Sequence, residues 1–186
     1  QPTKDPKEHL HDIVKRLAPK AFRRPATDKE IESFVSLAKP HHPKDQPMHK
    51  MVRAPLRALF SSPQFLFHAG QPGPLDDHAL ASRLSYFLWK TLPDDELTSL
   101  ANEKKLTQPK VLAVQVDRML NDPRSNRFIN DFLDGWLHLS DIDATTPDPT
   151  LYPEYDNELR QAMLAESRLY LRELLAKNLP ARNFIK

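Results

Sequence analysis

Eighteen prolines stand against only three glycines in this chain of 186 residues. Two-residue β-hairpin turns depend on glycine for their left-handed backbone angles, so a chain this poor in glycine has few places at which a sheet can reverse. Proline suits the first position of a helix, because its missing N–H group would have no intrahelical partner there. The balance of these two residues therefore favours helices over sheets.

Helix starts recur along the chain in the form expected of capped helices. Asp5-Pro6-Lys7-Glu8 and Thr27-Asp28-Lys29-Glu30 each place a capping residue three positions before a glutamate, and apolar residues at helical spacing follow. We expect the first helix to end near Ala18. We also expect a kink or restart near Ala54 in a later helix, because Pro55 removes a backbone hydrogen bond there.

The whole pattern predicts an all-α fold of seven or eight helices. A loop at Gln71–Pro74 divides it into a small N-terminal helical domain, residues 1–70, packed on a larger C-terminal helical bundle, residues 75–186. Apolar positions from Leu80 to Leu88 form a broad face, which predicts a central and mostly buried helix. An aromatic stripe that begins at Phe128 is expected to pack against this helix.

Charge and composition exclude several classes of function. The chain has 27 basic and 25 acidic side chains, and its one basic cluster, residues 15–24, contains a single aromatic residue, so we expect no nucleic-acid binding. No stretch approaches about 18 uncharged apolar residues, so no membrane span is expected. The absence of cysteine excludes disulfides, thiolate metal sites and covalent haem attachment. No cofactor is predicted.

Five histidine and methionine residues form a candidate metal site. They lie within eleven positions: His41, His42, Met48, His49 and Met51. Imidazole and thioether groups together are ligands that copper(I) prefers. In the alternative interpretation, which we favour, the methionines face the core and the histidines lie on a solvated proline-rich loop, because no established ligand spacing is present.

Two acidic clusters, Asp76-Asp77 and Asp94-Asp95-Glu96, contain carboxylates of the kind that perform acid–base hydrolysis. Each cluster also begins a predicted helix, where a carboxylate accepts hydrogen bonds from free N–H groups and opposes the helix dipole. Capping explains both clusters. We therefore predict no catalytic residue, and an enzyme site would require two of these helix starts to converge on a cleft.

Three further residues are candidates for binding. Arg83 stands in the middle of the most apolar helix, where a structural ion pair or anion recognition would explain it, and Arg23 and Arg24 invite the same two interpretations. Trp89 and Trp136 have the spacing of ordinary core residues, which we favour over a sugar platform or a hydrophobic cofactor slot.

Several motifs resemble a known pair of domains. They occur in order as Ala21-Phe22-Arg23-Arg24-Pro25, Ser62-Pro63-Gln64-Phe65-Leu66-Phe67, the run from Leu75 to Trp89, Pro93-Asp94-Asp95-Glu96-Leu97, Asp122-Pro123-Arg124, and Phe132-Leu133-Asp134-Gly135-Trp136-Leu137. Over most of residues 21–175 the chain resembles the paired domains of unknown function found in large planctomycete-type proteins that often carry a separate cytochrome c module.

The resemblance implies a context more than a chemistry. It implies an exported, extracytoplasmic, multidomain protein that continues beyond Lys186, with neighbouring domains, a cytochrome c module among them, as partners. We therefore expect a noncatalytic structural or interaction module that positions its neighbours or docks a redox module. The alternative is a fragment of a glycan-acting enzyme whose site is completed by downstream residues.

Overall fold

The computed structural model describes residues 5–41, 48–67 and 73–184. These residues contain nine α-helices, eight of them at least seven residues long, and no β-strand. The prediction of an all-α fold is confirmed. None of the helices in these ranges combines the length and the apolar character that crossing a membrane requires.

The chain forms two compact units, and each is described by itself. Unit 1 comprises residues 1–82 and 92–105, and unit 2 comprises residues 83–91 and 106–186. The predicted domain boundary at Gln71–Pro74 lies partly outside the described residues and stays a prediction. By its contacts, the segment 92–105 belongs to unit 1.

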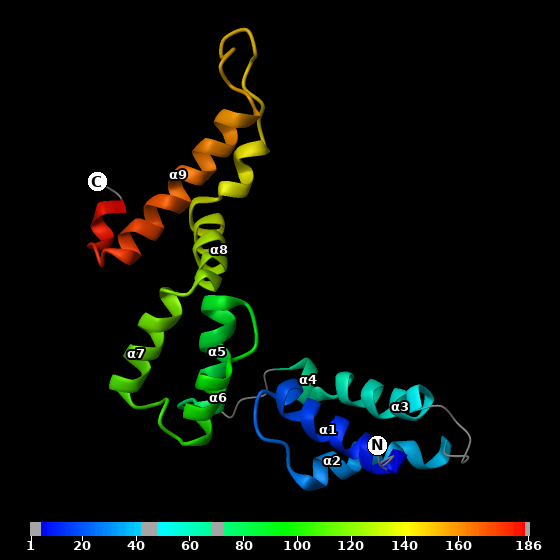
Figure 1. Ribbon diagram of the computed structural model, residues 1–186. Coiled ribbons are helices and arrows are strands. Elements are labelled where there is room, and N and C mark those ends of the chain that lie inside the picture. The colour runs from blue at the N-terminus through cyan, green and yellow to red at the C-terminus, as the bar shows by residue number, and fades with distance from the viewer. Residues whose placement is uncertain (1–4, 42–47, 68–72, 185–186) are drawn as a thin grey trace. The chain divides into compact units, whose positions relative to one another are not determined.

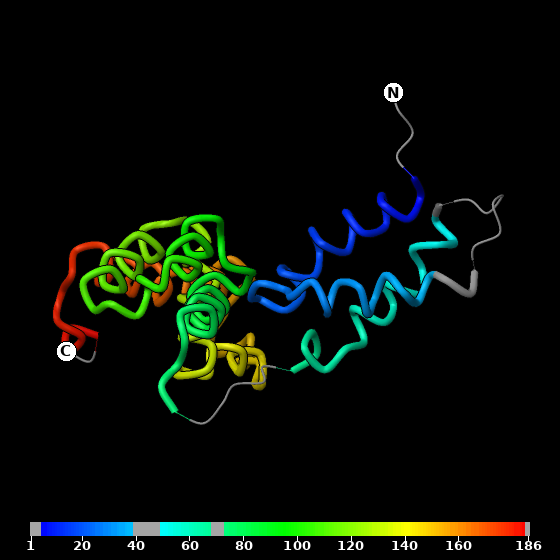
Figure 2. The backbone as a smooth tube through the Cα atoms, turned by 90° about the horizontal axis from the view of Figure 1, so that it is seen from below, coloured from blue at the N-terminus to red at the C-terminus, as the bar shows by residue number. Residues whose placement is uncertain are grey.

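Unit 1 is built around its first helix. Its elements are α1 (Pro6–Phe22), α2 (Asp28–Val35), the 3-10 helix η1 (Ser36–His41), α3 (Met48–Phe60), α4 (Pro63–Leu66), the start of α5 (Asp77–Trp89) and α6 (Asp95–Asn102). Helix α1 contacts α2, α3 and α4, and α1, α2 and α3 lie side by side (Figures 1 and 2). The first helix is therefore the centre of this unit.

The core of unit 1 follows the apolar spacing of α1 and α2. Leu10, Val14 and Ala18 of α1 are fully buried, and they meet Ile31 and Val35 of α2 in one apolar cluster. The expected capping box also forms, because the Thr27 hydroxyl accepts a hydrogen bond from the Glu30 amide while the Glu30 carboxylate accepts one from the Thr27 amide. Local capping and long-range packing agree in this part of the chain.

Two prolines behave differently from expectation. Helix α1 continues through Pro19 to Phe22 instead of ending near Ala18, and α3 continues through Pro55 without the expected restart. Each proline still removes one backbone hydrogen bond. Pro55 is fully buried and Phe22 lies in the core cluster, so apolar burial offsets the lost bonds.

Unit 2 combines the end of α5 with the C-terminal half of the chain. Its further elements are α7 (Pro109–Leu120), the 3-10 helix η2 (Pro123–Ser125), α8 (Asn126–Leu137), the 3-10 helix η3 (Leu139–Asp143), α9 (Asn157–Ala176) and the 3-10 helix η4 (Ala181–Phe184). Helix α8 contacts η2, η3 and α9, and α8 and α9 run antiparallel (Figure 1).

Long helices of unit 2 are less buried than their apolar content suggests. In the twenty residues of α9 only Leu174 is buried. On α5, which we expected to be mostly buried, Tyr86 is partly exposed and Phe87 is 63% exposed. A hydrophobic face that has no partner within its own unit is a surface available for contact.

Five helices end without the glycine that this position usually holds. Arg23, Lys90, Lys104, His138 and Asn178 have φ between 48° and 59°, and each follows the last residues of a helix. A left-handed residue at this point satisfies the last carbonyl groups of the helix, and glycine adopts it at the lowest cost. Because the chain has only three glycines, residues of other types adopt the left-handed conformation at these helix ends.

Leu10 provides a test of the core of unit 1. We expect Leu10→Ala to lower the free energy of unfolding by roughly 2–5 kcal/mol, because a fully buried side chain leaves a cavity. Leu66→Ala serves as the control, since Leu66 is 57% exposed and its loss should change stability by less than about 0.5 kcal/mol. Urea unfolding followed by circular dichroism measures both. Equal effects of the two substitutions would contradict this core.

Candidate functional site

The structure places the five residues of the predicted copper set only in part. Met51 is buried in the core of unit 1 and His49 is exposed on α3. His42, with the side chains of His41 and Met48, lies outside the described part of the chain. Among the described residues, no three acidic or histidine side chains gather in a way that could hold a metal ion. The copper set stays a prediction, and the position of Met51 agrees with the core interpretation.

Arg83, Trp89 and Trp136 have three different environments. Arg83 is exposed on α5, which corrects the premise that its guanidinium requires a buried counter-ion. Trp89 is fully buried, as core packing predicts. Trp136 is 45% exposed, so it does not belong to the core in the way that its helical spacing suggested.

Trp89 joins three elements of unit 2. Its indole N–H donates a hydrogen bond of 2.9 Å to the carbonyl of Met119 at the end of α7, and its own carbonyl accepts one of 2.8 Å from Arg127 of α8. The guanidinium carbon of Arg124 lies 3.4 Å from the centroid of its ring. Such a cation over an indole face adds to the stabilisation that burial provides.

Asp122 holds that cation in place. Its carboxylate accepts hydrogen bonds of 2.8 and 2.7 Å from Nε and Nη2 of Arg124, and a further one from the Arg124 backbone amide. The hydrogen bonds from the Arg124 side chain are the main reason that the pKa of Asp122 falls from its ordinary value to about 2. Asp122 is therefore ionised near neutral pH and is unsuited to act as a general acid.

Six aromatic rings form a continuous row in unit 2, which we call the aromatic row. Neighbouring ring centroids are 5.0 to 5.7 Å apart along its whole length. In order of contact, the rings are Phe87, Phe128, Phe132, Trp136, Phe184 and Tyr170. Helix α8 carries the middle of the row at positions four residues apart, so that successive rings lie on one face of the helix.

The aromatic row is exposed and held in place. Phe87, Phe132, Trp136 and Tyr170 are all exposed. The Tyr170 hydroxyl donates a hydrogen bond of 2.7 Å to the carbonyl of Asn183, which fixes η4 against α9 and sets Phe184 between Tyr170 and Trp136. The expected contact between the Phe128 stripe and α5 is confirmed by the Phe87–Phe128 pair.

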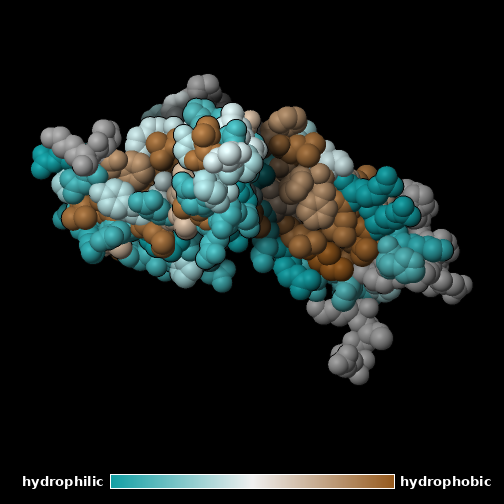
Figure 3. Space-filling model, turned by 90° about the horizontal axis from the view of Figure 1, so that it is seen from above, coloured by the Kyte–Doolittle hydropathy of each residue, from teal (hydrophilic) through white to brown (hydrophobic). Residues whose placement is uncertain are grey.

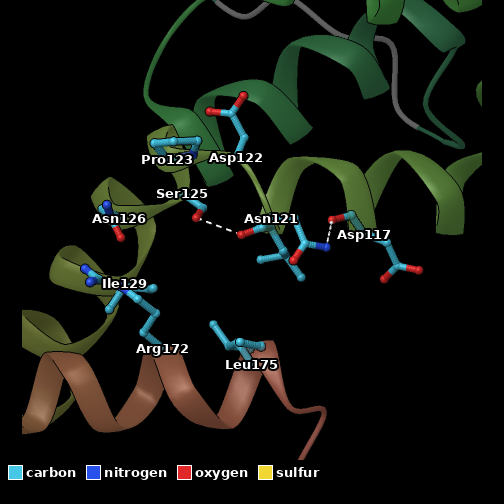
Figure 4. A pocket seen from close by; sticks show the side chains of 11 residues that line it. Asp117, Asn121, Asp122, Pro123, Ser125, Asn126, Ile129, Arg172 and Leu175 are labelled. Atoms are coloured by element: carbon cyan, nitrogen blue, oxygen red, sulfur yellow. Dashed lines mark hydrogen bonds between the residues drawn. The ribbon is translucent and has the colours of Figure 1, made fainter.

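A cavity of about 350 Å³ opens between α7, η2 and α9 in unit 2. Asp117 and Asp122 line it together with Arg172 of α9. Figure 4 shows that the two carboxylates point away from each other, while Arg172 extends from α9 toward α8. Hydrolysis by a carboxylate pair requires the two groups to face a shared substrate, so this cavity lacks that geometry.

Two of the five acidic residues singled out in the sequence, Asp76 and Asp94, cap helices. Asp76 accepts a hydrogen bond of 2.7 Å from the Ala79 amide, and Asp94 accepts one of 3.0 Å from the Leu97 amide. Both interactions satisfy N–H groups that the first turn of a helix leaves free. These two carboxylates are therefore engaged at helix starts, as capping predicts.

A second cavity, of about 460 Å³, lies in unit 1 and is called the basic cavity. Its residues come from the end of α1, the turn that follows, the start of α5 and the segment 92–102. The charged residues of its lining are Arg16, Lys20, Arg23, Arg24 and Asp95. Four of the five cations in the cluster noticed in the sequence thus line one partly open cavity.

Apolar side chains also gather on one face of unit 1, over α3 and α4 (Figure 3). Phe60, Leu66 and Phe67 are exposed there. The Phe60 ring meets the Phe65 ring edge-on at 5.2 Å between centroids, which holds α4 against the end of α3.

Sequence reasoning missed two functional features. Arg124 was recognised only within a motif, although an arginine two residues after a capping aspartate is well placed to pair with it. The row formed by Trp136 and Phe184 depends on the return of η4 to α8, which is a long-range contact with no local signal.

Comparison with known proteins places two family models in tandem. The model described as "PSD4: Protein of unknown function (DUF1592)" matches residues 75–186. The model described as "PSD5: Protein of unknown function (DUF1595)" matches residues 9–69. No curated protein and no solved structure matches the chain.

The pair of Asp122 and Arg124 predicts a dependence of stability on pH. Asp122→Asn keeps a capping side chain but removes the charge, so we expect a loss of about 1 kcal/mol at pH 7. Because folding lowers the pKa of Asp122 to about 2, the contribution is complete above an ordinary carboxyl pKa of about 3.9 and disappears as pH falls toward 2. Urea unfolding at several pH values measures it.

Glu154→Gln is the matched control, because this exposed carboxylate has no ion pair with any described residue. A deficit of Asp122→Asn that is the same at pH 3 and pH 7 would contradict the assigned ion pair.

The two tryptophans provide a second prediction. Trp89 is fully buried and Trp136 is 45% exposed, so we expect acrylamide to quench only part of the tryptophan fluorescence. Trp136→Phe should leave emission that acrylamide hardly quenches, because Trp89 lies beneath Arg124. Stern–Volmer plots measure the accessible fraction. Strong quenching of the Trp136→Phe variant would show that Trp89 is not enclosed.

Proposed function

We propose a function for this chain, which belongs to the PSD4 family of proteins of unknown function (DUF1592) and also matches the PSD5 model (DUF1595) in its N-terminal part. The proposed function is that of a noncatalytic interaction module of a larger exported protein. The module docks a neighbouring folded domain on the aromatic row. The observation that carries this proposal is the exposure of four rings within a row of six.

The chemistry of the aromatic row supports a protein partner. Aromatic residues and methionine are enriched at protein interfaces, because a rigid ring buries much area at little cost in conformational entropy. Leu159 and Met163 of α9 are also exposed, and so add aliphatic surface to that of the rings in unit 2. Single exposed apolar residues are common on any protein, whereas a contiguous set marks a contact surface.

The position of η4 beside the aromatic row supports a neighbouring domain as that partner. Phe184 is itself one of the six rings and η4 is fixed against α9. A polypeptide that continued after this residue would therefore begin at the aromatic row, where a following domain reaches it at high effective concentration. The first candidate is the cytochrome c module that the family resemblance implies.

The alternative of a glycan-acting enzyme fragment has less support. The carboxylates that it would use are engaged in capping, as for Asp76 and Asp94, or in the ion pair of Asp122 with Arg124. No observation on the described residues favours acid–base hydrolysis over docking, so docking is the function that we put forward.

Calorimetric titration of the chain with a purified c-type cytochrome module tests the proposal. We expect binding that Trp136→Ser weakens by about tenfold or more, because truncation of a central aromatic anchor typically costs over 1 kcal/mol. Leu151→Ser is the matched control: Leu151 is 71% exposed in unit 2 and is not part of the aromatic row. Equal weakening by both substitutions would contradict docking on the aromatic row.

A second arm identifies a different neighbour. Acrylamide quenching is compared between the chain alone and a longer polypeptide in which further domains follow it. Loss of Trp136 quenching in the longer polypeptide, without binding of the cytochrome, supports docking of another neighbouring domain. Unchanged quenching together with no cytochrome binding overturns the proposal.

A further inference from the structure

The basic cavity of unit 1 is lined by positive charges, and not all of them contribute to the stability of the fold. Arg16 and Lys20 lie four residues apart on α1, which places them on one face of the helix, and Arg23 and Arg24 follow in the turn after it. All four line the same space of about 460 Å³.

Two of these cations serve the fold. Arg24 forms a two-pronged pair with Glu30, with distances of 2.7 and 3.2 Å, and the pair ties the turn after α1 to α2. Arg23 donates a hydrogen bond of 2.9 Å to the carbonyl of Phe65 in α4. Their role in the fold accounts for their presence.

Arg16 and Lys20 are not explained in this way. Both are exposed, and neither has an ion-pair partner among the residues that the structure describes. Lys20 lies in the last turn of α1, where a cation opposes the negative end of the helix dipole, but Arg16 lies beyond the reach of that effect. Two like charges on adjacent turns of one helix also repel each other, which costs stability unless an anion lies between them.

The net charge of the basic cavity indicates which ligand charge it would bind. Among the lining residues four are basic and Asp95 is acidic, while Glu30 neutralises Arg24 from outside the lining. Two positive charges remain. A phosphate monoester carries about −1.5 to −2 near pH 7, and a guanidinium donates to it through two parallel hydrogen bonds.

The apolar walls of the basic cavity indicate that the ligand also has an apolar organic part. Pro19, Ala81, Leu92 and Pro93 present apolar surface beside the cations. The volume of about 460 Å³ lies in the range that holds small organic molecules and exceeds what a bare phosphate ion fills.

We propose that the basic cavity binds a small organic phosphate, whose phosphate group lies between Arg16 and Lys20 and whose apolar body lies against Pro19 and Leu92. This site is separate from the aromatic row and does not depend on the docking proposal. Organic sulfates share the oxyanion chemistry, and the test distinguishes the two by charge.

Calorimetric titration of the full chain at low salt uses phenyl phosphate, phenyl sulfate, inorganic phosphate and phenol as probes. We expect phenyl phosphate to bind tightest, inorganic phosphate more weakly because it lacks the apolar body, and phenol not to bind. Tighter binding of phenyl sulfate would overturn the choice of a doubly charged ligand. No binding of either ester at about 5 mM would overturn the site.

Paired variants separate the site from general electrostatics. Arg16→Gln with Lys20→Gln should weaken phenyl phosphate binding by about tenfold or more, since both charge-assisted contacts are lost. Lys50→Gln with Arg53→Gln removes the same charge from exposed positions of α3 outside the lining, and should leave binding within about twofold. Arg16→Lys with Lys20→Arg keeps the charge and should restore most of the affinity. Equal losses in the two glutamine pairs would overturn the site.

Discussion

Burial of Trp89 beneath a fixed arginine is the interaction on which unit 2 depends. The Trp89 indole N–H binds the carbonyl of Met119 at the end of α7, and the Trp89 backbone carbonyl binds Arg127 of α8. The Arg124 guanidinium lies over the face of the indole ring. Asp122 secures Arg124 from η2. One residue, through its indole and its backbone carbonyl, thus links α5, α7 and α8. The aromatic row starts at Phe87 on α5 and continues on α8, so its alignment follows from the same arrangement.

Local sequence signals predicted the helices well. They did not predict which helix faces are exposed, because exposure depends on long-range contacts. The capping box of Thr27 and Glu30 formed as expected, because its two residues lie within one turn. The end of α1 was misplaced because burial of Phe22 outweighs the hydrogen bond lost at Pro19. Trp136 has the helical spacing of a core residue, yet it is exposed. Spacing shows which residues share a helix face, but it does not show whether another segment of the chain covers that face.

The two candidate sites use opposite kinds of chemistry. The aromatic row is broad, apolar and built from rings that contact each other, which suits a large partner with a matching surface. The basic cavity is small and partly open and is lined by Arg16 and Lys20, which suits a small anion. An extended surface and a small cavity suit molecules of different size. If both proposals hold, the two surfaces lie on different residues, so binding at one does not block the other.

The left-handed helix ends have a consequence for how robust the protein is. Most residues other than glycine and asparagine cost roughly 1–2 kcal/mol in this conformation, and the chain uses such residues at Arg23, Lys90, Lys104 and His138. In exchange, the scarcity of glycine and the abundance of proline make the unfolded chain stiffer, so that less entropy is lost on folding. Lys104 and His138 lie outside both the aromatic row and the basic cavity. Glycine at these two positions would therefore relieve backbone strain without changing either surface.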